Sequence, residues 1–103
     1  MALNEIIKND FADICTRNSV IEFMGAKCDK CKKMECVLEE LAQDNPEITF
    51  VKINSANVLD IAKEYGVSEL PTILFFKNGK LVDKVCGVKS TSLLASKIAK
   101  IYN

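Results

Sequence analysis

Cys28 and Cys31 are separated by two residues within the lysine-rich segment MGAKCDKCKKM, residues 24–34. Two thiols at this spacing can form a redox-active disulfide, supply half of a metal site, or simply share the start of a helix. The run SVIEFM at 19–24, rich in strand-forming residues, precedes the pair, and a helical pattern follows it. The pair is therefore predicted to lie where a strand turns into a helix, a position at which the helix dipole stabilises a thiolate.

The surroundings predict different roles for the two thiols. Cys28 stands at the predicted helix start, where Lys27 and Lys30 add positive potential and Asp29 opposes it. We expect Cys28 to be the more acidic and more exposed thiol, and hence the nucleophile that attacks a disulfide. Cys31 lies one helical turn further in, close enough to Cys28 to form a disulfide bond with it. We expect Cys31 to be the resolving thiol.

The composition limits the classes of protein. Hydrophobic residues make up 49% of the 103 residues, enough for one domain with its own core. Fourteen basic residues balance fourteen acidic ones, so no overall positive field favours nucleic acid or an anionic membrane. There is no apolar run long enough to cross a bilayer, and residues 1–10 do not resemble a signal peptide. Five cysteines, an odd number, argue against a disulfide framework and predict a reducing, cytoplasmic setting.

The pattern along the chain predicts alternating helices and strands. The predicted strands are residues 19–24, 48–53, 71–76 and 81–86, and the predicted helices are residues 3–16 and 28–43, a short one capped by Asn57 and a last one capped by Ser90 or Thr91. Asn78-Gly79 is a hairpin signal, so the last two strands should be antiparallel. A strand–helix–strand crossover makes the first two parallel. The predicted fold class is thus α/β, with a mixed sheet of about four strands and helices on both faces.

The sequence resembles the thioredoxin family over nearly the whole chain, in the predicted leading helix and in four segments: VIEFMGAKCDKCKKM, FVKIN, YGVSELPTILFFKNGK and KVCGV. The resemblance implies a single thioredoxin-like domain over residues 1–103, with the thioredoxin fold and a reversible Cys28–Cys31 disulfide in place of any bound cofactor. It also implies that the protein exchanges disulfides in partner proteins and is recharged by a reductase that draws on NADPH. We expect a monomer, with no nucleic-acid or membrane partner.

The resemblance assigns roles to single residues. Cys28 matches the nucleophile of the family and Cys31 its resolving cysteine. Pro71 matches a proline that faces the dithiol and follows a cis peptide bond. The backbone of the preceding residue, here Leu70, pairs with the substrate chain in the family. Gly87 matches a glycine that keeps the substrate groove open.

Glu22 is an acid inside a predicted buried strand. Burial disfavours the charged carboxylate, so the pKa of Glu22 should rise. The family has a buried aspartate at this position, which helps move a proton to or from the resolving thiol, and Lys52 matches a lysine that approaches that acid. Our hypothesis is that Glu22 accepts the proton of Cys31 through a water, steadied by Lys52. The other interpretation is a glutamate that points from the strand into water.

The sequence departs from the family pattern beside the cysteines. Asp29-Lys30 stands where thioredoxins usually carry Gly-Pro, two positions that tune the reduction potential. The residue before the nucleophile is Lys27 instead of the usual aromatic residue, and the chain contains no Trp. The substrate surface formed by Lys27, Asp29 and Lys30 is therefore expected to be more polar and cationic than usual, which favours acidic or differently shaped partners.

Two other functions stay open at this point. Cys28, Cys31 and Cys36 offer three sulfurs to a soft metal, but histidine is absent and small copper chaperones have a different element order, so no metal site is predicted. A glutaredoxin-like reductase that uses glutathione is the other alternative. The Leu-Pro-Thr sequence at 70–72 and the predicted N-terminal helix look more like thioredoxin, and no basic pocket for glutathione stands out.

Overall fold

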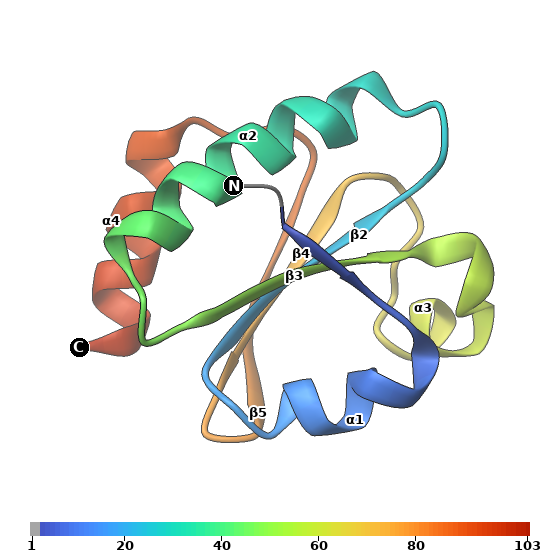
Figure 1. The fold of residues 1–103 in the computed structure, drawn as a ribbon, viewed down its shortest axis with the longest axis horizontal. Helices are drawn as coiled ribbons and strands as arrows, with labels where there is room; N and C mark the ends of the chain where they lie inside the picture. The colour runs from blue at the N-terminus through green and yellow to red at the C-terminus, as the bar shows by residue number, and fades with distance from the viewer. Residues whose placement is uncertain (1–2) are drawn as a thin grey trace.

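A five-stranded mixed sheet runs through the centre of the protein (Figure 1), in a computed structural model that describes residues 3–103. Met1 and Ala2, the first residues of the segment compared with signal peptides, lie outside the described residues. The elements in chain order are β1 (Asn4–Ile6), α1 (Lys8–Cys15), β2 (Ser19–Met24), α2 (Asp29–Asp44), β3 (Thr49–Asn54), the 3₁₀ turn η1 (Ser55–Asn57), α3 (Leu59–Glu64), β4 (Thr72–Lys77), β5 (Lys80–Cys86) and α4 (Thr91–Tyr102). Among these elements, none of the helices is long and apolar enough to cross a membrane.

The strands are arranged in the order β1-β3-β2-β4-β5, so β2 lies at the centre of the sheet. It pairs in parallel with β3 and antiparallel with β4, and β4 and β5 form the predicted hairpin. Asn78 and Gly79 at its turn have φ values of 51° and 84°, the left-handed conformations that tight hairpin turns require. The predicted mixed sheet and terminal hairpin are confirmed.

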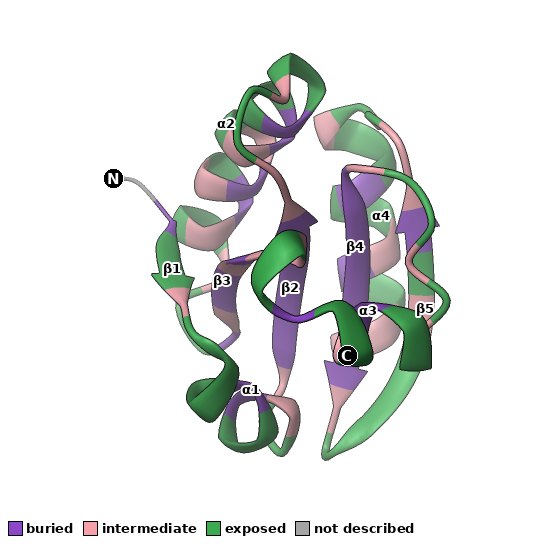
Figure 2. Cartoon of the chain, turned by 90° about the vertical axis from the view of Figure 1, so that its right-hand side faces the viewer, coloured by how far each residue is buried: buried purple, intermediate pink, exposed green. Residues whose placement is uncertain are grey.

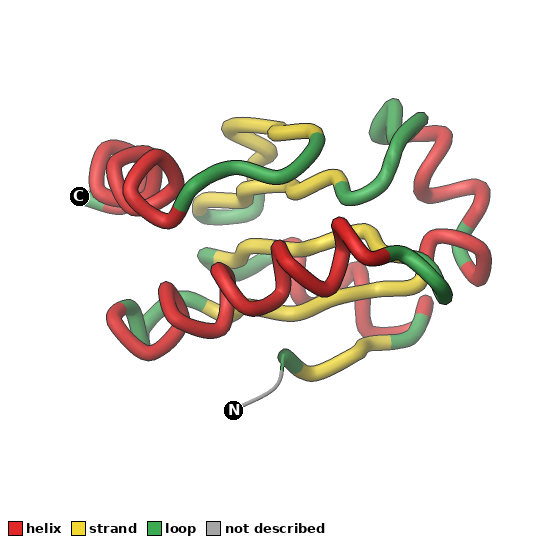
Figure 3. The backbone as a smooth tube through the Cα atoms, turned by 90° about the horizontal axis from the view of Figure 1, so that it is seen from above, coloured by secondary structure: helices red, strands yellow, loops and turns green. Residues whose placement is uncertain are grey.

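Helices cover both faces of the sheet, as predicted. In Figure 1, α2 and α4 lie to the upper left of the strands and α1 and α3 to the lower right. Seen from above, helical segments lie in front of the strands and, fainter, behind them (Figure 3). Side chains alternate along each strand, which gives two cores. Val20 and Phe50 belong to the core under α2 and α4, whereas Ile21 and Val51 belong to the core under α1 and α3. Figure 2 shows the central strands β2 and β4 almost entirely buried, so a polar side chain on β2 is removed from water.

The predicted helix over residues 3–16 is wrong at its start. Residues Asn4–Ile6 form β1, an edge strand parallel to β3, and α1 begins only at Lys8. A strand of three residues is too short to show alternation, and the apolar residues around it happen to fall at helical spacing. Ile7, expected to face inward, is 64% exposed. The sheet therefore has five strands instead of about four.

The predicted helix cap at Asn57 is also wrong. Asn57 ends the turn η1, and the side chain that caps this turn is that of Asn54, whose Oδ1 accepts a hydrogen bond from the N–H of Ala56 at 3.0 Å. The short helix α3 starts two residues after Asn57, at Leu59. At the last helix, Ser90 is the cap, because its Oγ accepts from the N–H of Leu93 at 3.2 Å.

Candidate active site

The cysteine pair forms a disulfide at the N-terminus of α2, directly after the central strand β2. Cys28 is the N-cap residue of the helix, and its Sγ accepts a hydrogen bond from the N–H of Cys31 at 3.1 Å. Cys28 is half-buried, whereas Cys31 is only 1% exposed. The difference in exposure expected from the sequence is confirmed, and Cys28 is the sulfur of the pair that a partner protein can reach. A hydrogen-bond donor already points at this sulfur, as a thiolate requires.

The loop that carries Pro71 lies at the same end of the sheet as the disulfide. Phe23, near the end of β2, pairs with Thr72 at the start of β4, so the segments that lead to Cys28 and away from Pro71 are neighbours. A methyl group added to Gly25 would lie 3.0 Å from Cδ1 of Leu70, which shows how closely the two loops pack. The Leu70–Pro71 peptide bond is cis, as the resemblance implied.

Gly87 joins this loop through its backbone. Its N–H donates a hydrogen bond of 2.8 Å to the carbonyl oxygen of Pro71. A Cβ added to Gly87 would meet nothing within 4 Å, so the surface beside it is open, but its φ of 82° lies in the left-handed region that favours glycine. A side chain at this position would therefore be disfavoured by the backbone conformation, even though there is room for it beside the loop.

Three charged residues next to the disulfide are exposed: Lys27, Asp29 and Lys30. Lys27 has a φ of 61°, an uncommon conformation for a residue with a side chain, which costs about 1–2 kcal/mol relative to glycine. The structure thus places all three in the solvent around Cys28, where a docked partner would meet them.

Glu22 is fully buried in the middle of β2. Its side chain lies on the same face of the strand as that of Val20, under α2 and α4, because side chains two residues apart point the same way. Within residues 3–103, neither carboxyl oxygen of Glu22 has a hydrogen-bond partner. Burial, reinforced by the negative charge of Glu35 and partly offset by Lys52, raises the pKa of Glu22 from its ordinary 4.5 to about 8. The interpretation of Glu22 as a glutamate pointing into water is wrong.

Lys52 lies opposite Glu22 in the parallel register of β2 and β3, but its ammonium pairs with a different carboxylate. Nζ of Lys52 donates to Oε1 of Glu35 on α2 at 2.7 Å, and the two side chains are only 18% and 13% exposed. This hydrogen bond raises the pKa of Lys52 above its ordinary value. Sequence reasoning missed Glu35. The available signal was its position four residues after Cys31, which puts both on the same side of the helix.

Comparison with known proteins gives the family of the chain. The model of the Thioredoxin family matches residues 3–100, nearly the whole chain. The chain belongs to the thioredoxin family. Members of this family are thiol-disulfide oxidoreductases, which act on protein disulfides and are recycled by reductases. The resemblance seen in the sequence is thereby confirmed.

Several thioredoxins show how far the similarity extends. A thioredoxin of Chlamydia trachomatis is 34% identical over 96 residues, which cover 92% of this chain and 94% of that protein. Thioredoxin H-type 2 of Nicotiana tabacum is 36% identical over 74 residues, or 72% of this chain, and the chain spans only 63% of that plant protein's length. The oxidised form of mitochondrial thioredoxin 3 from Saccharomyces cerevisiae matches with a TM-score of 0.84 and 30% identity, covering 96% of this chain and 95% of that one. This likeness confirms the predicted thioredoxin fold.

The similarity to glutaredoxins is weaker. Glutaredoxin-3 of Mus musculus is 35% identical over 74 residues, which cover 72% of this chain but only 22% of that protein. The comparisons therefore favour the thioredoxin interpretation over the glutaredoxin alternative.

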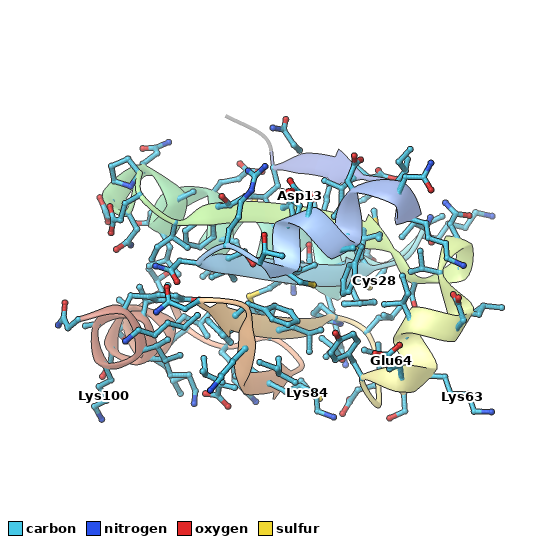
Figure 4. All side chains as sticks on the ribbon, turned by 90° about the horizontal axis from the view of Figure 1, so that it is seen from below. Asp13, Cys28, Lys63, Glu64, Lys84 and Lys100 are labelled. Carbon is cyan, nitrogen blue, oxygen red and sulfur yellow. A yellow bond between two sulfur atoms is a disulfide. The ribbon has the colours of Figure 1, made fainter. Side chains whose placement is uncertain are left out.

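The other cysteines take no part in the disulfide. Cys15, Cys36 and Cys86 are free, and Cys36 is exposed on α2. Burial, together with the charge of Glu64 (labelled on α3 in Figure 4), raises the pKa of Cys15 to about 11. Across the described residues 3–103, no three or more His, Cys, Asp and Glu side chains are grouped so that they could hold a metal ion. The three sulfurs considered for a soft metal, those of Cys28, Cys31 and Cys36, form no such group among these residues.

The buried carboxyl predicts how stability depends on pH. Between pH 4.5 and 8 the unfolded chain has released the proton of Glu22 while the folded protein keeps it, so the folded state binds more protons and stability falls as pH rises. The slope is about 1.4 kcal/mol per pH unit for one proton. Urea unfolding of the oxidised protein at pH 5, 6, 7 and 8 should show this slope, and Glu22→Gln should lack it. Equal slopes in the two proteins would contradict the assignment.

Proposed function

We propose that this protein reduces disulfide bonds in partner proteins through its own Cys28–Cys31 pair. The observation that carries the proposal is the disulfide at the N-terminus of α2, with Cys28 accessible, Cys31 buried and the cis-Pro71 loop beside it. Membership of the thioredoxin family supports the same function. The proposed setting is the reducing cytoplasm, in which the three remaining cysteines stay free, and the proposed form is a monomer.

The reaction follows from the different positions of the two sulfurs. In the dithiol form, the thiolate of Cys28 attacks one sulfur of the partner disulfide, and the other partner sulfur leaves as a thiolate. Cys31 then loses its proton and attacks Sγ of Cys28, which releases the second partner sulfur and closes the Cys28–Cys31 disulfide. The partner gains the two electrons that this protein loses, and its two thiolates take up two protons, one equivalent to that released by Cys31 and one from solvent. A reductase of the thioredoxin-reductase type, drawing on NADPH, restores the dithiol.

This function predicts the behaviour of two cysteine variants. With NADPH and a thioredoxin reductase, the unmodified protein should reduce the disulfides of insulin, and Cys28→Ser should abolish the activity because it removes the attacking sulfur. Cys31→Ser should instead accumulate mixed disulfides on Cys28, since no resolving thiol remains. Turbidity of the released insulin chains and mass spectrometry of the trapped species measure the two effects.

Cys36→Ser is the matched control, because Cys36 is an exposed cysteine on the same helix that takes no part in the disulfide. Its activity should equal that of the unmodified protein. Efficient reduction of the protein by glutathione but not by the reductase would contradict the proposal in favour of the glutaredoxin alternative. Trapping on a cysteine other than Cys28 would contradict the nucleophile assignment.

The proposed role of Glu22 is to accept the proton of Cys31 through a water. Three observations support it: the carboxyl is buried, lacks a protein hydrogen-bond partner among the described residues, and faces the helix that carries Cys31. A base titrating near pH 8 is poised to exchange a proton with a thiol under physiological conditions. Lys52, opposite Glu22 across the strand pair, favours the ionised form of this acid through its positive charge.

Removal of this base should slow the second step of the reaction. Glu22→Gln keeps the shape of the side chain but cannot accept the proton, so insulin reduction should slow about 100-fold, the lower end of a general-base contribution. The rise of the rate as Glu22 ionises near pH 8 should also disappear. Stopped-flow measurements from pH 6 to 9 test both effects. An unchanged rate and pH profile would exclude Glu22 as the proton acceptor.

The proposed partner surface consists of Lys27, Asp29 and Lys30 around Cys28, with the backbone of Leu70 and the open surface at Gly87 on the adjacent loops. The side chains of the first three are exposed and carry a net charge of plus one (two lysines against one aspartate). The family's usual aromatic residue before the nucleophile is replaced by Lys27. A partner segment with acidic residues beside its disulfide therefore fits this surface.

Exchange with short peptides should show this charge preference. A disulfide peptide flanked by glutamates should react several-fold faster than the same peptide flanked by lysines, and added salt should reduce the difference, since exposed charges are screened. Lys27→Glu should remove the preference. Lys63→Glu makes the same charge change on α3, at a side chain that extends into solvent (Figure 4), and should leave the preference intact. Equal rates for the two peptides would contradict the proposal.

A further inference from the structure

Two carboxylates and one ammonium share the space between the sheet and α2. Glu22 comes from β2, Lys52 from β3 and Glu35 from α2. The ammonium lies 2.7 Å from Oε1 of Glu35, and this pair is largely shielded from solvent. Glu22 is fully buried and has no hydrogen-bond partner within residues 3–103. In this arrangement the ammonium of Lys52 pairs with the carboxylate of Glu35 and not with that of Glu22.

The fold explains why these three groups meet. The register of the parallel strands puts Glu22 and Lys52 side by side. Glu35 follows Cys31 by four residues on α2, so it lies one turn below the buried sulfur on the same side of the helix. The ammonium of Lys52 contacts the carboxylate on the helix, and this helix residue is in line with the redox pair.

Burial favours the protonated form of Glu22, and the charges of the cluster add to this preference. With Glu35 and Lys52 paired, their charges cancel, and a neutral Glu22 leaves the cluster uncharged. Ionisation of Glu22 would add an unpaired negative charge in the interior, which is strongly disfavoured. Without the carboxylate of Glu35, the ammonium would balance Glu22 instead, and the ionised form of Glu22 would be favoured.

We propose that Glu35 is a positioning residue of the redox site: by holding the ammonium of Lys52, it adds to the effect of burial in keeping Glu22 protonated at neutral pH. The inference rests on the proposed function, in which Glu22 exchanges a proton with Cys31. A protonated Glu22 can supply the proton that Cys31 needs when the reductase opens the disulfide, and it must lose that proton before it can act as a base. Glu35 thereby sets the pH at which the site changes from proton donor to proton acceptor.

The elements packed against Glu22 contribute few other charges. The polar groups on this face are Cys31 and Glu35 from α2, Lys52 from β3 and, beyond Lys52, Glu5 from β1. The strand β4 and the helix α4 contribute apolar side chains, among them Ile73, Leu94 and Ile98. Glu5 is exposed and acts on Lys52, raising its pKa. The charges that bear on Glu22 itself are those of Glu35 and Lys52.

Substitution of Glu35 tests the inference without reference to activity. The titration of the Glu22 side-chain carboxyl can be followed by NMR in oxidised protein labelled with ¹³C-glutamate. In Glu35→Gln the midpoint should fall by at least about one pH unit, the usual effect of an opposite charge a few ångströms away. Glu39→Gln removes a negative charge one turn further along α2 and should leave the midpoint unchanged. Glu35→Asp, which retains the carboxylate, should keep it near that of the unmodified protein.

The pH profile of insulin reduction gives a second measurement. Glu35→Gln should move the profile to lower pH, and the same substitution in the Glu22→Gln background should move nothing, because Glu35 acts through Glu22. An unchanged Glu22 midpoint, an equal effect of Glu39→Gln, or a shift that persists without Glu22 would each overturn the inference. If the unmodified protein reduces no disulfide, the proposed function fails, while the NMR titration still decides the role of Glu35.

Discussion

The central position of β2 is the constraint on which the rest of the site depends. This strand is hydrogen-bonded along both edges and covered by helices on both faces, so every side chain in its middle is removed from water. An acid placed there must keep its proton, find a counter-ion or be stabilised by a bound water. The same strand delivers the chain to the turn at which α2 begins. The chemistry of Glu22 and the position of Cys28 are thus consequences of one buried strand.

The two faces of α2 near its start serve different purposes. Its outer face exposes Asp29 and Lys30 to solvent, together with the accessible sulfur of Cys28. Its inner face carries Cys31 and, one turn on, Glu35, which is tied to the sheet through Lys52. In the proposed mechanism, partner recognition and proton exchange therefore occur on opposite sides of a single helical turn, connected by the disulfide.

Much of this arrangement could be predicted from the sequence, because its signals are local. The CxxC spacing after a strand pattern, the acid within an apolar run and the Asn-Gly turn each need only a few adjacent residues. The short strand β1 could not be predicted, since three residues carry no periodicity and their pairing with β3 is non-local. The partner of Lys52 was missed for a similar reason. Strand register identifies Glu22 as its neighbour, but only the packing of α2 on the sheet brings Glu35 within 2.7 Å.

The ion pair between Glu35 and Lys52 also has a consequence for how such a protein can diversify. Because both side chains of the pair are largely buried, substitutions of Glu35 or Lys52 leave the surface around Cys28 that partners contact unchanged. Conversely, the exposed residues between and before the cysteines can vary without disturbing the buried charges. Under the proposed roles, working pH and partner choice are therefore two nearly independent variables on one scaffold, and selection or engineering can adjust each of them in turn.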